Sequence, residues 1–354
     1  MQKLKLKNSN LKGFNHKYRH SNYNKLHIES FSRFTIMFST RCTFLCSHCY
    51  NWKLPDNYNE LCLKEWNNVL ENISHIANSD AELVIGGDGM AELDYKLIKI
   101  LKKSNELGLK TLLNTNGFLI NKIILNRLHN EGGLKKISIS LDFLDSKKQN
   151  KQRGINKSYE HIQKLIETIR ESKMNIQVTF NCIFMKPNLD QILPLAKWNR
   201  ELNINSNINF QAIMQPFNSA YIKNWYELSR FKEMWPGNEQ NTYKIIDELI
   251  QLKKKGYNIG NTIKQLQIFK EYFRNSRLDK IKGCNFKEVG LTIDSNGHAK
   301  LCPYMNPFTH VKNKSLNDSI LSDNHIKTIN NMFECKDHCM QTVNCSFNKS
   351  LFVK

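Results

Sequence analysis

The chain has 354 residues, of which 40% are hydrophobic, and its formal net charge is +20. A chain of this size and apolar content buries a sizeable core, and we expect one large domain and one small one. Ten cysteines would suit a secreted disulfide protein only in a much shorter chain, and no apolar N-terminal stretch resembles a signal peptide. No apolar run approaches the roughly 20 residues of a membrane-spanning helix. We therefore expect a cytoplasmic protein that has reduced cysteines and no membrane contact.

The positive charge is spread along the chain. Lysines occur over whole helical faces, as in LIKILKKSNELGLK, and they are accompanied by abundant asparagine. A basic surface attracts nucleic acid, anionic lipid or an acidic substrate, but no recognised nucleic-acid motif accompanies this charge, and its spread indicates a composition bias of the whole chain. We expect no nucleic-acid partner, and we interpret the basic residues 1–30 as an N-terminal arm.

From Arg33 onward, short β-prone runs alternate with longer segments of helical spacing. The predicted strands are 33–39, 81–86, 110–115, 136–142, 176–184 and 207–214. The predicted helices between them are 63–76, 95–107, 120–131, 159–172 and 189–202. This alternation predicts parallel strands joined by crossover helices. Six strands and five helices indicate an α/β fold of the partial (β/α)6 TIM-like barrel type, without closure into eight strands.

The chain changes character twice after this region. Residues 217–280 form a predicted helical connecting region, whose strongest helix, YKIIDELIQLKKKG, ends at Gly256. Residues 281–354 contain five of the ten cysteines. The predicted organisation is therefore an arm (1–30), a barrel core (31–216), the connecting region and a small cysteine-rich domain.

Polar and glycine residues gather where the predicted strands end. These residues include Cys42, Cys46 and Cys49, then Gly86, Gly87 and Asp88, then Asn116, and then Ser140 and Asp142. In parallel β/α folds, ligands bind at the carboxyl ends of the strands. These residues therefore predict a single pocket.

The spacing Cys42-x3-Cys46-x2-Cys49 lies immediately after the first strand. Three thiolates can bind three irons of a [4Fe–4S] cluster and leave the fourth iron open for a reactive ligand. The alternative is a structural zinc site, which needs four ligands. The nearest fourth candidate, His48, is adjacent to Cys49 and poorly placed to share one ion with it.

The loop Arg41–Asn51 resembles the cluster-binding loop of the radical S-adenosylmethionine (SAM) superfamily. The resemblance implies that SAM binds the open iron and that reductive cleavage releases a 5′-deoxyadenosyl radical, which abstracts hydrogen from a substrate. In that family an aromatic residue commonly precedes the third cysteine, whereas this chain has His48.

Three further segments resemble motifs of that family. Gly86-Gly87-Asp88-Gly89 is similar to its GGEP segment, although Asp and Gly replace Glu and Pro; the resemblance implies that this segment approaches the SAM amine. Ser140 and Asp142, followed by Arg153-Gly154, resemble S-L-D-G and R-G, which implies contacts with the SAM carboxylate and ribose. Asn116 lies in a TNG that often ends the third strand, although Asn-Gly is also a common turn pair.

The C-terminal part resembles the SPASM/twitch extension of one branch of the superfamily. Cys284-x12-Gly297-x4-Cys302 matches its opening, and the pair Asn296-Gly297 predicts a tight hairpin turn. The second group of this module is Cys335, Cys339 and Cys345. The resemblance implies one auxiliary [4Fe–4S] cluster held by Cys284, Cys302 and two of these three. Zinc at this site is the alternative.

The resemblance leaves the substrate and the catalytic residues open. Relatives with such an extension modify peptides or protein side chains, or oxidise small alcohols and sugars, and we favour peptide modification in an oxidoreductase-type reaction. The resemblance also implies an external one-electron donor such as flavodoxin or ferredoxin. An iron–sulfur electron carrier without SAM chemistry is the alternative of another class. We interpret Cys62 and Cys182 as structural, because one stands at a predicted helix start and the other inside a strand.

Overall fold

The computed structural model describes residues 31–39, 42–53, 59–86, 93–216, 219, 222, 224–237, 239–274, 290–320 and 322–335. The expected arm 1–30 lies outside the described residues. So do Gly87 and Asp88, and the C-terminal cysteines Cys284, Cys339 and Cys345.

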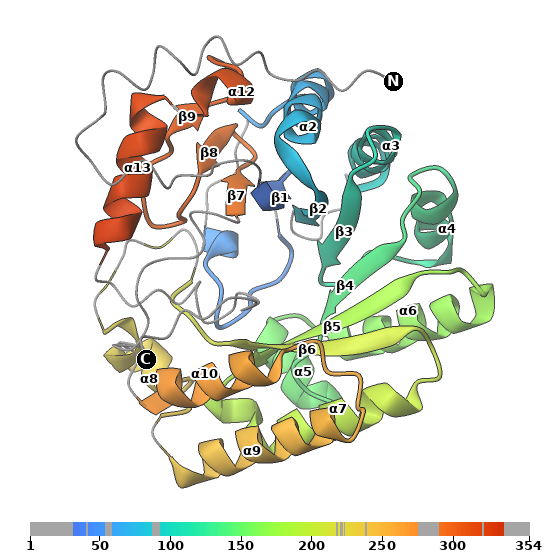
Figure 1. Ribbon diagram of the computed structural model, residues 1–354. Coiled ribbons are helices and arrows are strands. Elements are labelled where there is room, and N and C mark those ends of the chain that lie inside the picture. The colour runs from blue at the N-terminus through green and yellow to red at the C-terminus, as the bar shows by residue number, and fades with distance from the viewer. Residues whose placement is uncertain are drawn as a thin grey trace.

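The described strands form one nine-stranded sheet in the order β6-β5-β4-β3-β2-β1-β7-β8-β9. Their bounds are β1 Phe31–Met37, β2 Ala77–Gly86, β3 Lys110–Thr115, β4 Lys136–Ser140, β5 Gln177–Phe184, β6 Ser206–Ala212, β7 Gly290–Ile293, β8 His298–Lys300 and β9 Thr309–His310. Strands β1 to β6 pair in parallel with their neighbours, and β7 continues the sheet parallel to β1. The sheet curves, and its crossover helices lie on the outer side (Figure 1). This arrangement confirms the predicted α/β class and its partial-barrel character.

The crossover helices lie close to where the spacing predicts them. Their bounds are α2 Leu63–Ile76, α3 Ile98–Glu106, α4 Lys122–Asn130, α6 Ser158–Ser172 and α7 Ile192–Glu201. The later helices are α8 Ser229–Lys232, α9 Gln240–Lys254, α10 Ile263–Arg274, α12 Leu316–Ser319 and α13 Asp323–Glu334. Short helical elements are the 3-10 helices η2 Asn51–Lys53, η4 Lys186–Gln191 and η5 Trp225–Glu227 and the π-helix η3 Leu93–Leu97. A sixth crossover helix, α5 (Ser146–Arg153), is absent from the prediction because its sequence, SKKQNKQR, contains no apolar residue to set a period.

Two predicted strand starts need correction by two or more residues, and the strands predicted to end at 39, 142 and 214 end two residues earlier. Strand β1 begins at Phe31, two residues before the predicted start, and β2 begins at Ala77, four residues early. The first half of β2, ANSD, is polar, so its composition does not indicate a strand. The extension is a consequence of pairing, since Phe31 lies opposite Ala77.

The two faces of the sheet have different chemistry at β5 and β6. Every second residue of each strand is buried. The buried set faces the helices: the ring of Phe180 lies 5.0 Å from that of Trp198 in α7, and the ring of Phe184 lies 5.3 Å from that of Phe273 in α10. The alternate residues, such as Asn181 and Asn209, therefore face the concave side of the sheet.

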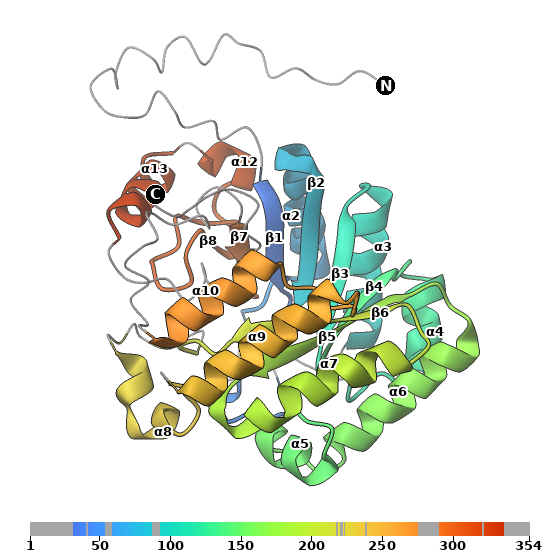
Figure 2. The ribbon, with the colours of Figure 1, turned by 60° about the horizontal axis from the view of Figure 1, so that its bottom comes forward.

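The outer edge of β6 is covered by the turn after α9. Ile259 forms a parallel bridge with Ile208, and the N–H of Gly260 donates to the carbonyl of Ile208 at 2.7 Å. The side chain of Asn261 accepts from the Phe210 N–H and donates to its carbonyl, as a further strand would. Helices α9 and α10, before and after this turn, run side by side in front of β6 (Figure 2). This cover removes an exposed edge at which the sheet would otherwise pair with another chain.

The C-terminal strands attach to the core through β1 and α2. The predicted hairpin at Asn296-Gly297 is confirmed as the turn between β7 and β8, where Gly297 has φ +97°. Across the boundary, the N–H of Leu61 donates to the carbonyl of Ser295 at 2.7 Å. In the part of the chain that is described, no helix has the length and apolarity needed to cross a membrane.

Candidate iron–sulfur and SAM site

The segment 42–53 leaves the carboxyl end of β1 and lies on the concave side of the curved sheet (Figure 1). Phe44 anchors it, because its ring is 2% exposed and packs edge-on against Phe118 with ring centroids 5.4 Å apart. Phe118 follows β3 and contacts the His161 ring of α6 at 4.3 Å. Phe44 thus fixes the loop to two neighbouring β/α units. We name residues 42–53 the cluster loop.

The cluster loop also pairs with the end of α5. The N–H groups of Leu45 and Ser47 donate to the carbonyls of Arg153 and Gln152, each at 3.2 Å. Gly154 ends α5 with φ +65°, and a Cβ there would lie 2.7 Å from the Leu45 carbonyl oxygen. The Arg153-Gly154 pair therefore forms the surface on which the cluster loop rests, and glycine is needed for the close approach.

Each sulfur of the triad accepts at least one N–H donor. The N–H of Phe44 lies 3.5 Å from Cys42 Sγ, and that of Asn51 lies 3.4 Å from Cys49 Sγ. The third donor is Nη1 of Arg153, 3.9 Å from Cys46 Sγ. N–H donors stabilise a thiolate more than a thiol, and hydrogen bonds of this kind tune iron–sulfur clusters.

The donor set suits an iron–sulfur cluster. The triad offers three thiolates, and in a [4Fe–4S] cluster each thiolate binds a different iron. Beside the triad, Ser47 Oγ and Arg153 Nε are buried and have no hydrogen-bond partner in the described chain. Buried polar atoms are normally paired, so these two fit a site that a polar cofactor completes.

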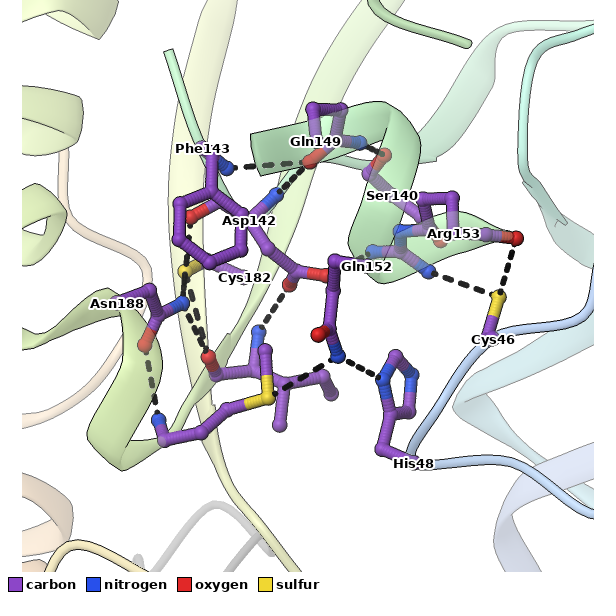
Figure 3. A network of polar contacts seen from close by, with 12 residues as sticks. Cys46, His48, Ser140, Asp142, Phe143, Gln149, Gln152, Arg153, Cys182 and Asn188 are labelled. Atoms are coloured by element: carbon purple, nitrogen blue, oxygen red, sulfur yellow. Dashed lines mark hydrogen bonds and ion pairs between the residues drawn. The ribbon is translucent and has the colours of Figure 1, made fainter. Parts of the chain in front are cut away.

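A buried ion pair stands behind Cys46 (Figure 3). Nη2 of Arg153 lies 2.7 Å from Oδ2 of Asp142, and the two side chains are 6% and 0% exposed. Oδ1 of Asp142 accepts from the Ile183 N–H at 2.8 Å, and Gln149 Oε1 accepts from the Asp142 N–H at 3.0 Å. Asp142 is therefore held by the backbone of β5 and by a side chain of α5. A buried pair with such support is rigid, and loss of one member costs several kcal/mol.

His48 is held by a neutral partner. Nε2 of Gln152 lies 2.9 Å from Nδ1 of His48, and the same amide contacts Sδ of Met185 at 3.4 Å. Burial, and after it the charge of Arg153, lower the pKa of His48 to about 4. The imidazole is therefore neutral near pH 7, and because Gln152 donates to Nδ1, the ring proton resides on Nε2.

The far side of the cluster loop is clamped by α8. Nη2 of Arg230 donates to the Ser47 carbonyl at 3.0 Å, and its guanidinium carbon lies 4.7 Å from the Tyr50 ring centroid and 5.9 Å from that of Trp52. Trp52 Nε1 in turn donates to the Cys46 carbonyl at 3.2 Å. The connecting region thus contributes directly to the position of the cluster loop.

The other predicted pocket residues lie at neighbouring strand ends. Gly86 is buried at the end of β2, and its carbonyl accepts from the Phe38 N–H at 3.0 Å. Asn116 Oδ1 accepts from the Phe118 N–H at 3.0 Å, which closes the turn after β3. Ser140 ends β4 half-buried, and its carbonyl accepts from Gln149 Nε2 at 3.4 Å. Asp142 and Arg153 pair with each other, so the structure gives Arg153 contacts that the sequence does not indicate.

Of the C-terminal cysteine candidates, the described residues include two. Cys302 follows β8 and is half-buried, and Cys335 follows the last residue of α13. Cys62 occupies the N-cap of α2, where the Glu65 carboxylate accepts its N–H at 2.7 Å. Cys182 is fully buried within β5, and burial raises its pKa well above the usual value.

A row of polar side chains crosses the concave face near the same strand ends. Ser138 Oγ donates to Asn114 Oδ1 at 3.0 Å, and Asn181 Nδ2 donates to Ser138 Oγ. Asn209 Nδ2 continues the row to Asn181 Oδ1 at 3.3 Å. The interiors of β/α barrels are usually filled by branched apolar residues. The row gives this interior hydrogen-bonding capacity without net charge.

Sequence reasoning missed the residues that support the loop from outside it. Gln149 and Gln152 belong to a helix without an apolar period, and nothing in the sequence around Arg230 connects it with Ser47. The one indication in the sequence was that Gln152 directly precedes Arg153-Gly154, which resembles a motif of the superfamily.

Comparisons with known proteins agree with this geometry. The family model of the Radical SAM superfamily matches residues 36–198. The chain is 24% identical over 164 residues to PqqA peptide cyclase of Bradyrhizobium diazoefficiens, which covers 46% of this chain and 42% of that protein. It is 29% identical over 154 residues to GTP 3′,8-cyclase of Haemophilus influenzae, covering 41% and 43%. The matches thus span less than half the length of these curated relatives.

Solved structures resemble a larger part of the chain. Streptococcus suis SuiB bound to precursor peptide SuiA has a TM-score of 0.62 at 18% identity, covering 90% of this chain and 71% of that one. The structure of anSMEcpe with bound AdoMet and Cp18Cys peptide has a TM-score of 0.60 at 16% identity, covering 90% and 91%. At these identities the likeness establishes a shared fold.

Proposed function

Because the chain belongs to the radical SAM superfamily through residues 36–198, we propose that it is an enzyme of radical chemistry. The superfamily uses a [4Fe–4S] cluster and SAM, which together supply a 5′-deoxyadenosyl radical that abstracts hydrogen from a substrate. The observation that carries the proposal is the cluster loop, in which three cysteine sulfurs each accept an N–H donor.

The residues of this chain divide into two roles in the proposal. Cys42, Cys46 and Cys49 hold the cluster, and the neighbouring strand ends hold SAM. The proposed SAM contacts are Gly86, Gly87, Asp88, Asn116 and Ser140. Asp142 and Arg153 are engaged with each other behind Cys46, so we assign them to support of the cluster loop.

An auxiliary [4Fe–4S] cluster is proposed in the C-terminal part. Its ligands would be Cys284, Cys302 and two of Cys335, Cys339 and Cys345. In support of this proposal, Cys302 follows β8 by two residues, after the hairpin turn at Gly297. An external electron donor would reduce the SAM cluster.

For the substrate we propose a peptide or protein side chain. The support is that two structures whose likeness covers 90% of this chain were solved with peptides, SuiB with precursor peptide SuiA and anSMEcpe with Cp18Cys peptide. The uncharged row Asn114, Ser138, Asn181 and Asn209 suits a substrate rich in hydrogen-bonding groups, such as a peptide backbone. A sugar or small alcohol offers similar groups, and its dehydrogenation is the alternative. An electron carrier without SAM chemistry is the alternative of another class.

Deuterium transfer tests the proposal and separates the substrates. The reduced, iron-loaded protein is incubated with SAM and with fully deuterated short peptides encoded beside its own gene, and separately with deuterated sugars and alcohols. Deuterium in 5′-deoxyadenosine from a peptide supports peptide modification. Transfer from a sugar or alcohol but from no peptide would show that the substrate is a small molecule and not a peptide. A lack of transfer from every compound would count against hydrogen abstraction.

A further inference from the structure

We propose that the positive charge of Arg153, which Asp142 holds in place, raises the reduction potential of the cluster bound through Cys46. The inference rests on the proposed function, because it requires a cluster at the triad. In this inference Arg153 of the Arg-Gly pair acts on the cluster and does not bind SAM.

The guanidinium has one well-defined orientation. Its Nη2 contacts Oδ2 of Asp142 at 2.7 Å, while its Nη1 donates to Cys46 Sγ at 3.9 Å. In the thiol form, Sγ of Cys46 also donates to the Arg153 carbonyl at 3.8 Å, so side chain and backbone of one residue both contact this sulfur. A thiolate bound to iron has no proton to donate, and the guanidinium is then the favourable contact.

The location makes this charge effective. Arg153 is 5% exposed and Asp142 is fully buried, so little water screens the field that reaches the sulfur. Arg230 binds the Ser47 carbonyl and is half-buried, and Lys53 lies over the Tyr50 and Trp52 rings. Arg153, in contrast, contacts a ligand sulfur directly.

The charge is permanent. A guanidinium stays protonated in proteins, and Oδ2 of Asp142 at 2.7 Å stabilises its charged form. Reduction adds one negative charge to the cluster, and a fixed cation beside a ligand sulfur stabilises the reduced form more than the oxidised form. Asp142 orients the cation and, as an anion, partly offsets it.

The two members of the ion pair therefore have opposite predicted effects. Arg153→Gln removes the cation and should lower the midpoint potential of the cluster. Asp142→Asn removes the anion, keeps the shape of the side chain, and should raise the potential. A general loosening of the site would move both variants in the same direction, so opposite signs distinguish electrostatics from structural damage.

The measurement is an EPR-monitored redox titration of the anaerobically reconstituted full chain. The cluster followed is the one whose EPR signal changes when SAM is added. Lys148→Gln is the matched control, because Lys148 lies on the same helix and pairs with Asp190 at 3.0 Å, but both are half-exposed. Its potential should equal that of the unaltered protein.

The variant Arg153→Lys keeps the positive charge. It allows the inference to be tested even if Arg153→Gln does not fold well enough to bind the cluster. If Arg153→Gln loses its cluster, a potential in Arg153→Lys close to the unaltered value and a raised potential in Asp142→Asn would still support the inference. Equal potentials in all variants, or shifts of one sign in Arg153→Gln and Asp142→Asn, would overturn it. Failure of the unaltered protein to bind iron at the triad would instead overturn the proposed function.

Discussion

Gly154 and Leu45 lie in direct backbone contact, so that a Cβ added to Gly154 would approach the Leu45 carbonyl oxygen and Cβ to 2.7 Å. Gly154 follows the last residue of α5, and Leu45 is the residue before Cys46. The close approach of the C-terminal end of α5 to a proposed cluster ligand therefore depends on the absence of a side chain at Gly154.

Replacement of this glycine should displace the cluster loop. Gly154→Ala adds a clash to the strain of φ +65° and should reduce iron incorporation severalfold. Gly108→Ala is the matched control, since Gly108 has φ +74° and nothing within 4 Å of its added Cβ. Iron per chain after reconstitution is the measurement. Equal iron in both variants would show that the contact does not position the loop.

Arg230 should govern how long the cluster survives. Arg230→Ala removes a hydrogen bond to Ser47 and the cation–π contacts with Tyr50 and Trp52, together about 1–3 kcal/mol of loop stability. The loss of cluster absorbance in the presence of a chelator should accelerate about tenfold. Arg200→Ala removes a comparable contact with Tyr257, 4.6 Å from the ring, and should have the unaltered rate. The same rate in both variants would exclude a role for the clamp.

The fold was largely predictable, because the strands β3 to β6 and the helices between them keep clear apolar periods. Strand β5 shows why, since its alternate residues Val178, Phe180 and Cys182 face helices while Asn181 faces the concave side. The predicted site was recovered only in part. Cysteine spacing locates the thiolates, but the contact of Arg230 with Ser47 joins residues far apart in the sequence, and no local pattern encodes it. Likewise, the pairing of Arg153 with Asp142 depends on α5, a helix with no apolar residue.

His325 should make the stability depend on pH. It is fully buried in α13, with its ring centroid 4.9 Å from that of Phe308 and 6.5 Å from that of Phe31. Burial lowers its pKa from 6.5 to about 4, so between these values the unfolded chain binds more protons. The contribution of buried, neutral His325 to the free energy of unfolding is fully present above pH 6.5. It falls by at most about 3 kcal/mol as the pH decreases towards 4.

The measurement for His325 is the free energy of unfolding in urea at pH 7 and pH 5. His325→Phe should reduce the difference between the two values, because phenylalanine does not titrate. His75→Gln, a change at an exposed histidine of α2, should leave the difference intact. An unchanged difference in His325→Phe would show that other groups control the acid sensitivity.

The number of bound irons tests the two cysteine groups separately. The reconstituted chain should hold about eight irons if both clusters are of the cubane type, and about four after Cys42, Cys46 and Cys49 are replaced by Ala. Replacement of Cys284 and Cys302 should also leave about four. Cys62→Ala should change nothing, because Cys62 caps a helix. Zinc in the C-terminal part, with iron only at the triad, would contradict the auxiliary cluster.

Reductive cleavage of SAM tests the central proposal most directly. The anaerobic, iron-loaded protein is mixed with dithionite and SAM, and the products are quantified by chromatography. We predict slow formation of equal amounts of 5′-deoxyadenosine and methionine even without substrate, and none from Cys46→Ala, which lacks one thiolate of the triad. Absence of cleavage by the fully iron-loaded, unaltered protein would contradict the enzymatic proposal and favour the electron-carrier alternative.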